Sequence, residues 1–192
     1  GGCDSGTPPT GATCKPPGLS DVVNIFSNPN AFAALKKDGS VVAWGSSSFG
    51  GSINTGVDVS KDVVQIFSTS SAFAALKSDG SVKVWGWGAY GSTIPSGVAT
   101  ELTSNVVNIF STQRAFAALK SDGSVVAWGD STYGGCDSGT VSGATCKPGD
   151  LSDVVNIFST QYAFAALKTD GSVKVWGNTN RSEEHTSELQ SP

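Results

Sequence analysis

The chain has no methionine, and its single histidine, His185, lies close to the C-terminal end. Nucleophilic catalysis assisted by histidine therefore has no base within the repeated part of the sequence. Four aspartates recur at equivalent positions in turns, whereas a general acid needs one environment that tunes its pKa. These are Asp38, Asp79, Asp122 and Asp170. We therefore expect a protein that is not an enzyme and uses no cofactor.

Charged residues are also scarce, at 15% of 192 residues, and the formal net charge is -4. No basic patch is available to neutralise phosphates, which excludes nucleic acid as the expected partner. The sequence has neither a signal segment nor an apolar run long enough to span a membrane. With 24 glycines and 38% hydrophobic residues, the composition is typical of a loop-rich all-β protein and not of a disordered one.

Only four cysteines are present, as Cys3 with Cys14 and Cys136 with Cys146. No CxxC motif occurs, so a tetrahedral zinc site would require distant loops to combine, and we expect no metal. Two local disulfides fit better, each closing a short loop and contributing about 2 to 3 kcal/mol. They would indicate an extracellular or cell-surface location. Free thiols in a cytosolic protein are the alternative.

What the sequence does contain is one unit written four times. A strand-like VVNIF or VVQIF precedes AFAALK, an Asp-Gly pair and a segment that ends in Trp-Gly. One tryptophan closes each repeat, and these four of the five tryptophans, Trp44, Trp85, Trp128 and Trp176, stand 41 to 48 residues apart, which suits one small antiparallel sheet per repeat. The repeat cores are residues 22–45, 63–86, 106–129 and 154–177. We predict an all-β fold, a β-propeller fragment of about four blades, over residues 1–180.

Within the third repeat, VVNIF (Val106–Phe110) predicts a strand that is buried on both faces. Asp122-Gly123 predicts a two-residue type I′ hairpin turn with positive φ at both residues. After the second repeat, Ser92–Ala99 is a candidate for a fourth, outer strand, where Pro95 requires an edge position. The alanines of AFAAL let neighbouring sheets approach, and Phe and Trp fill the space between them.

The pattern V-V-x-I-x-S, A-L-K-x-D-G-x-V-x-x-W-G resembles the repeat of the regulator-of-chromosome-condensation family, over roughly residues 16–178. The short repeat with IPSGV is most similar in style to bacterial members. The resemblance implies β-propeller blades, of which that family has seven. The sequence lacks the family's Gly-x-x-His before the second strand and its Gly-Gln-Leu-Gly after the tryptophan. Nucleotide exchange and chromatin activity are therefore not carried over, and four repeats predict an open arc.

Both ends of the sequence differ from the repeats between them. Residues 1–15 match residues 134–147, which follow a Trp-Gly strand, so the first residue falls inside a repeat. We expect an internal segment of a longer repeat protein, with any signal segment outside it. Residues 181–192 are rich in glutamate and resemble the in-frame translation of a sequencing adapter. We expect this part to be an artefactual, disordered tail.

If the repeated residues are scaffold, the residues that differ between repeats are candidates for binding. They fall in the link between the first and second strands and in the loop after Trp-Gly. The link residues are expected to line one rim, and aromatic or arginine side chains supply most binding hot spots. The candidates are Asn30, Ser71, Arg114 and Tyr162 in the links, and Trp87, Tyr90 and Tyr133 in the loops.

An alternative applies to Phe49, Tyr90 and Tyr133, which recur five residues after each tryptophan. This recurrence favours packing between blades over binding. For Arg114, Tyr162 and Trp87, which do not recur, both readings stay open. We expect a secreted or surface module that binds another protein. The alternative is a lectin-like carbohydrate-binding module in which aromatic rings stack on sugars.

Overall fold

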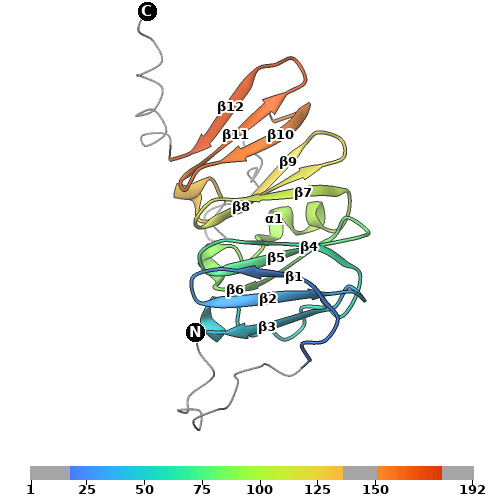
Figure 1. The fold of residues 1–192 in the computed structure, drawn as a ribbon. Helices are drawn as coiled ribbons and strands as arrows, with labels where there is room; N and C mark the ends of the chain where they lie inside the picture. The colour runs from blue at the N-terminus through green and yellow to red at the C-terminus, as the bar shows by residue number, and fades with distance from the viewer. Residues whose placement is uncertain (1–17, 136–150, 179–192) are drawn as a thin grey trace, which may run out of the picture.

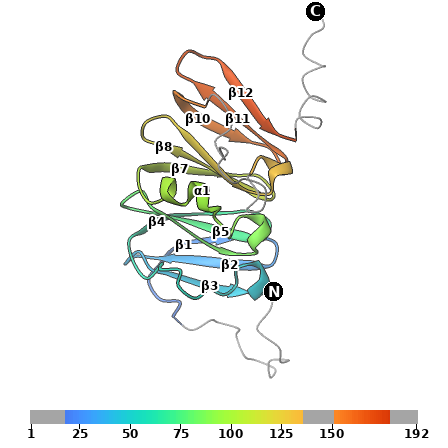
Figure 2. The same cartoon turned by 180° about the vertical axis from the view of Figure 1, so that it is seen from behind.

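The computed structural model describes residues 18–135 and 151–178, which form four three-stranded antiparallel sheets stacked as blades (Figure 1). The all-β propeller expectation is confirmed. The two terminal blades lie at opposite ends of the stack, as the reverse view also shows (Figure 2). The four cysteines and the tail of residues 181–192 lie outside the described residues.

Each blade takes three consecutive strands in chain order, with the middle strand paired to both neighbours. The first blade has β1 (Val22–Ser27), β2 (Ala31–Lys36) and β3 (Val41–Gly45). The second has β4 (Val63–Ser68), β5 (Ala72–Lys77) and β6 (Val82–Gly86). The third has β7 (Val106–Ser111), β8 (Ala115–Lys120) and β9 (Val125–Gly129). The fourth has β10 (Val154–Ser159), β11 (Ala163–Lys168) and β12 (Val173–Gly177).

The first strand of each blade is not buried on both faces, so that expectation is wrong. In β7 the pairing with β8 shifts register between Val106 and Asn108. Such a bulge places an extra residue on one strand, and Val107, the extra residue here, is 53% exposed. Val106 and Ile109 remain buried beneath it. One face of the strand therefore packs in the core, and the other does not.

The Asp-Gly turns are also not type I′ turns. Among the described residues, Gly123 has a positive φ of 78° but Asp122 is not in the left-handed region. The Gly123 N–H donates to the Lys120 carbonyl, and the Lys120 N–H to the Ser124 carbonyl. This is a type I turn followed by a glycine bulge. The Asp122 carboxylate stabilises it by accepting from the Ser124 N–H and hydroxyl at 3.0 and 2.6 Å.

In the first three blades the glycine of this turn also joins one blade to the next. The Gly80 carbonyl accepts a hydrogen bond from the Val106 N–H at 3.1 Å. A Cβ on Gly80 would lie 2.6 Å from the backbone nitrogen of Asn105, and φ there is +76°. Only glycine fits both the backbone conformation and this close approach. The repeated Asp-Gly pair therefore serves the stacking of blades as well as the hairpin.

The candidate fourth strand at Ser92–Ala99 does not form. The chain makes a short helix α1 (Ser96–Ala99) followed by a 3-10 turn η3 (Thr100–Leu102). Val98 and Leu102 are four residues apart and both 2% exposed, so the apolar spacing fits a helical turn and not a strand. The fixed φ of Pro95 suits the residue before a helix. As a result, β6 is the outer edge of its sheet.

The core lies between blades, as expected from the small alanines. Ala72, Ala74 and Val84 of the second blade pack with Phe116 and Trp128 of the third. The same arrangement joins the first blade to the second and the third to the fourth. Because alanine leaves room above each middle strand, the aromatic pair of the next blade can fill it at close packing density.

Candidate binding surface

The two variable regions of each repeat meet at one end of the blade. In the second blade the Trp87 N–H donates to the Ser71 carbonyl at 2.9 Å, and in the third the Asp130 N–H donates to the Arg114 carbonyl at 3.0 Å. These bonds join the link before the middle strand to the loop after the last strand. The Asp-Gly turns lie at the opposite end of each hairpin. The surface formed by the links and the loops after Trp-Gly is called the variable end below.

Aromatic rings follow one another across the variable end from the first blade to the fourth. The Phe49 and Trp87 ring centroids are 6.4 Å apart, and those of Trp87 and Tyr90 6.3 Å. The Arg114 guanidinium lies 4.5 Å from the Tyr90 centroid and 4.9 Å from that of Tyr133. Tyr133 in turn contacts Tyr162 at 5.4 Å. This set is called the aromatic ladder: Phe49, Trp87, Tyr90, Arg114, Tyr133 and Tyr162.

The ladder is held by packing at some positions and is open to solvent at others. Phe49 and Tyr133 pack against the cores between blades, as expected for these two of the three recurring aromatics. Trp87, which does not recur, is 47% exposed. Its equivalent in the first blade is Ser46, and the 3-10 turn that follows forms in both blades. The fold therefore does not require a ring at this position.

Arg114 contacts the Tyr90 ring of the second repeat and pairs with a carboxylate of its own repeat. One guanidinium nitrogen lies 3.6 Å from a carboxylate oxygen of Asp130, and the Arg114 side chain is 35% exposed. Two ring faces and one carboxylate thus surround the cation. A cation–π contact contributes roughly 0.5 to 1 kcal/mol at an exposed site and more where it is desolvated. Arg114 is consequently both a packing residue and the cationic centre of the ladder.

Two of the candidate link residues do not join the ladder. Ser71 is 2% exposed, so the expectation that its side chain lines a surface rim is wrong. Its main chain instead anchors the loop of Trp87. Asn30 is exposed beside the first blade, where its N–H donates to the Asn28 side chain at 3.0 Å.

The sequence did not reveal the residue that fixes each link. The Thr69 hydroxyl accepts from the Ala72 N–H at 3.0 Å and donates to the Tyr90 carbonyl at 2.9 Å. Thr112 makes the same pair of bonds with Ala115 and Tyr133. Both threonines are buried. Three of the four links carry threonine at this position, whereas the residues beside it vary. This recurrence is the sequence feature that could have identified it as a scaffold position.

The aspartates of the four Asp-Gly turns are stabilised in their ionised form by the turn itself. The pKa of Asp38, Asp79, Asp122 and Asp170 is lowered, first because the serine two residues on hydrogen-bonds to the carboxylate. Among the residues that the structure describes, no three His, Cys, Asp or Glu side chains gather as a metal site would require. Within the same residues, no helix has the length and apolar character needed to cross a membrane.

No protein-family model matches the chain, and no curated protein matches it either. Solved structures do. The yeast complex of Kap60 with RCC1 (Prp20) aligns with a TM-score of 0.57 and 19% identity, over 81% of this chain and 43% of the other. Prp20p from Saccharomyces cerevisiae, described with its binding to Gsp1p and histones, gives 0.53 and 22%, over 81% and 43%.

A third similar structure is the CRINKLY WD40 ectodomain of the Arabidopsis thaliana receptor kinase ACR4. It aligns with a TM-score of 0.52 and 20% identity, over 80% of this chain and 49% of the other. The chain thus spans less than half the length of each of these three structures. At such identities the likeness establishes an RCC1-like propeller fold, and function has to be argued from the surface.

Proposed function

We propose that this protein is a non-catalytic binding module that recognises another protein through the variable end of its blades. The observation that carries the proposal is the half-exposed ring of Trp87 within a continuous row of aromatic side chains and one arginine. Tryptophan, tyrosine and arginine are the residue types that dominate protein-binding hot spots. The similar structures are consistent with this, since the yeast RCC1 structure is a complex with another protein.

The proposal extends to where the protein works. The pairing of Cys3 with Cys14 and of Cys136 with Cys146 fits an oxidising compartment, and we place the module outside the cell or on its surface. Peptide mapping of secreted material without reduction tests this part. Recovery of both local disulfide-linked peptides supports it, and four free thiols would contradict it.

The binding role is tested with two variants of the ladder and one control. Trp87→Ser introduces the residue that the first blade has at this position, and Tyr162→Ala removes the ring at the other end. Val107→Thr is the control, because Val107 is similarly exposed but belongs to β7. Ligands selected on the immobilised protein from a displayed library of folded domains serve as probes.

Each ladder variant should weaken the binding of a probe that recognises the variable end by about 2 kcal/mol, or roughly thirtyfold in Kd. The melting temperature of Trp87→Ser should stay close to that of the parent, because the same turn forms with serine in the first blade. Equal affinity of all selected probes for the parent and both ladder variants would refute the proposal. So would a loss of affinity as large in Val107→Thr.

A second candidate function is carbohydrate binding, and the half-exposed ring of Trp87 favours it. Its ring stacks against that of Tyr90 with the centroids 6.3 Å apart, and the part of the Trp87 ring that stays exposed is where a sugar ring would stack. A glycan array separates the two functions. Avidity for multivalent glycans that disappears in Trp87→Ser would favour the lectin-like reading. Absence of binding on the array, together with affinity for the probes selected from the library of folded domains, would favour protein recognition.

A further inference from the structure

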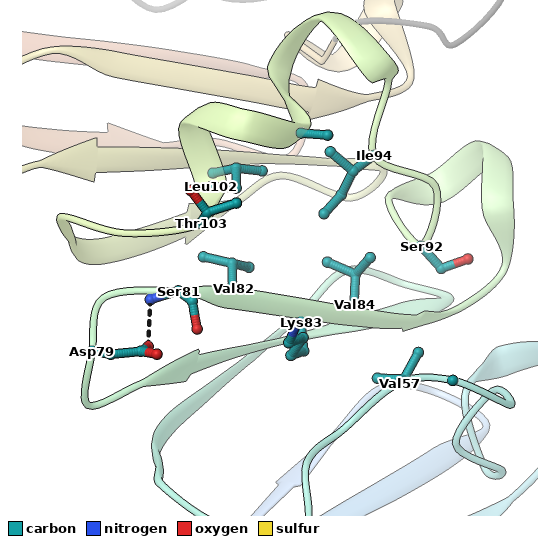
Figure 3. Close-up of a pocket in the computed structure, with 12 residues that line it drawn as sticks. Val57, Asp79, Ser81, Val82, Lys83, Val84, Ser92, Ile94, Leu102 and Thr103 are labelled. Atoms are coloured by element: carbon teal, nitrogen blue, oxygen red, sulfur yellow. Dashed lines mark hydrogen bonds between the residues drawn. The ribbon is translucent and has the colours of Figure 1, made fainter.

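A second surface lies along the outer edge of the second blade, and the residues that line it are not those of the aromatic ladder. A groove of about 540 Å³ runs beside β6, between the segment around Val57 on one side and the turn with Ile94 and Leu102 on the other. Figure 3 shows Val82 and Val84 of β6 directed toward that turn, with Val57 on the opposite side of the strand. The groove therefore follows a strand edge and has a wall on each face of the sheet.

The edge of β6 carries unused backbone groups. The Gly86 N–H points outward and donates to the Asn54 side chain at 3.2 Å. Because outward groups alternate along a strand, the N–H groups of Val84 and Val82 face the same way. Within the described residues, neither of these two groups has an outward hydrogen-bond partner. A strand edge of this kind is a template for another extended chain.

In the first blade, the equivalent strand edge is already hydrogen-bonded to a neighbouring segment of the chain. There the outward N–H of Val41, the equivalent of Val82, donates to the carbonyl of Val59 at 3.0 Å. Val59 is 4% exposed and fills the space beside the strand. Val59 lies four residues before the start of β4, and Leu102 lies four residues before the start of β7. Leu102 is therefore the equivalent residue beside the second blade. Leu102 lies in the 3-10 turn η3, and its carbonyl makes no such bond among the described residues.

We propose that the groove beside β6 binds an extended peptide of a partner protein, which adds a fourth strand to the second blade. Side chains of an added strand would point alternately to the two walls. One wall, with Val82, Val84 and Ile94, is apolar and suits β-branched residues. On the other face lies Lys83, which has no ion pair within the described residues. The peptide is therefore extended, with valine-like residues on either side of an acidic one.

The chain itself supplies the probe for this proposal. Residues 55–60, Thr-Gly-Val-Asp-Val-Ser, contain the Val59 that occupies the corresponding edge in the first blade. A dye-labelled peptide of this sequence is titrated with the protein, and binding is followed by fluorescence anisotropy. In parallel, amide chemical shifts are recorded by NMR. Saturable binding should occur, with shifts at the amides of Val82 and Val84.

Three controls distinguish strand addition from other contacts. A peptide methylated on the valine nitrogens should bind about tenfold more weakly, because it cannot complete the ladder of hydrogen bonds. Lys83→Glu should weaken the unmodified peptide about fivefold. Lys174→Glu is the matched control, since Lys174 has the same neighbours, Val-Lys-Val-Trp-Gly, on the fourth blade. It should leave peptide affinity unchanged.

Absence of saturable binding would overturn the proposal, as would equal affinity for the methylated peptide or an equal loss in Lys174→Glu. Sedimentation that shows a dimer disrupted by Lys83→Glu would also overturn it, because the occupant would then be a second copy of the chain. Trp87→Ser should not affect binding of the peptide, since Trp87 does not line the groove. Failure here is thus distinguishable from failure of the variable end as a binding site.

Discussion

The stacking of blades makes a quantitative prediction about one indole group. The Trp128 Nε1–H donates to the Gly91 carbonyl of the preceding repeat at 2.9 Å, and the Trp128 side chain is fully buried. Trp85 and Trp176 make equivalent bonds to the preceding repeats. Trp44 has the same neighbours in sequence, Val-Val-Ala-Trp-Gly, and stacks on its phenylalanine at a similar distance. No equivalent bond from its indole is present within the described residues.

Trp128→Phe should therefore cost much more stability than Trp44→Phe. Loss of the donor leaves a buried carbonyl without its partner, which destabilises by roughly 1 to 3 kcal/mol. The smaller ring also leaves a cavity between the second and third blades, and this adds to the loss. For a chain of this size, a loss of about 2 kcal/mol lowers the melting temperature by roughly 4 to 8 °C.

The measurement is unfolding in urea and by heat for both variants under the same conditions. Trp44→Phe makes the same chemical change on a partly exposed ring, so the difference between the variants reports the bond and the burial. Equal losses in the two variants would refute the view that these bonds hold neighbouring blades together. Hydrogen exchange adds a local test, because β7 to β9 should lose protection first in Trp128→Phe.

Two further predictions concern the turns. Gly91→Ala should destabilise the protein strongly, because φ at Gly91 is +111° and a Cβ there would lie 2.6 Å from the Phe116 ring. Gly97→Ala should be neutral or slightly stabilising, because no atom lies within 4 Å of a Cβ at that position. Similar melting temperatures of the two variants would contradict this prediction. The pKa of Asp122 is lowered by its hydrogen bond from Ser124, so its stabilising contribution is present above the ordinary value of 3.8 and is lost as the pH falls through the folded pKa. The difference in unfolding free energy between the parent and Asp122→Asn should shrink in that acid range, and a difference independent of pH would count against the bond.

The sequence was sufficient for the blades because each repeat carries the same local signals. Alternation around AFAALK, a turn at Asp-Gly and a large ring at each tryptophan all favour one hairpin, and four copies predict stacking. The type of turn was not predictable in the same way. Asp-Gly permits positive φ at both residues, but the Asp122 carboxylate favours the other turn by bonding to Ser124. Only contact geometry distinguishes the two.

Tertiary contacts also decided the residues that the sequence placed wrongly. Ser71 looks like any polar link residue, yet it is buried because its carbonyl holds the loop of Trp87. Ser92–Ala99 has the length of a strand, but burial of Val98 and Leu102 against the third blade favours a helical turn. The sequence indicated both variable regions of the candidate surface. It gave no sign that Arg114 would join them by lying between two tyrosines.

The backbone explains why the variable end can differ from blade to blade. Its loops are fixed by main-chain bonds such as Trp87 N–H to Ser71 carbonyl, and by buried threonines such as Thr69. None of these bonds uses the side chain of residue 87. The first blade forms the same 3-10 turn with Ser46 at the equivalent position. The turn ends at Gly50 with φ of +89° in the first blade and at Gly91 with φ of +111° in the second. The Trp87 ring contacts Phe49 and Tyr90 but remains half exposed, and the turn forms without it in the first blade. A partner that covers the exposed part of this ring would bury more apolar surface, so under the proposed function Trp87 is the residue on which binding should depend most.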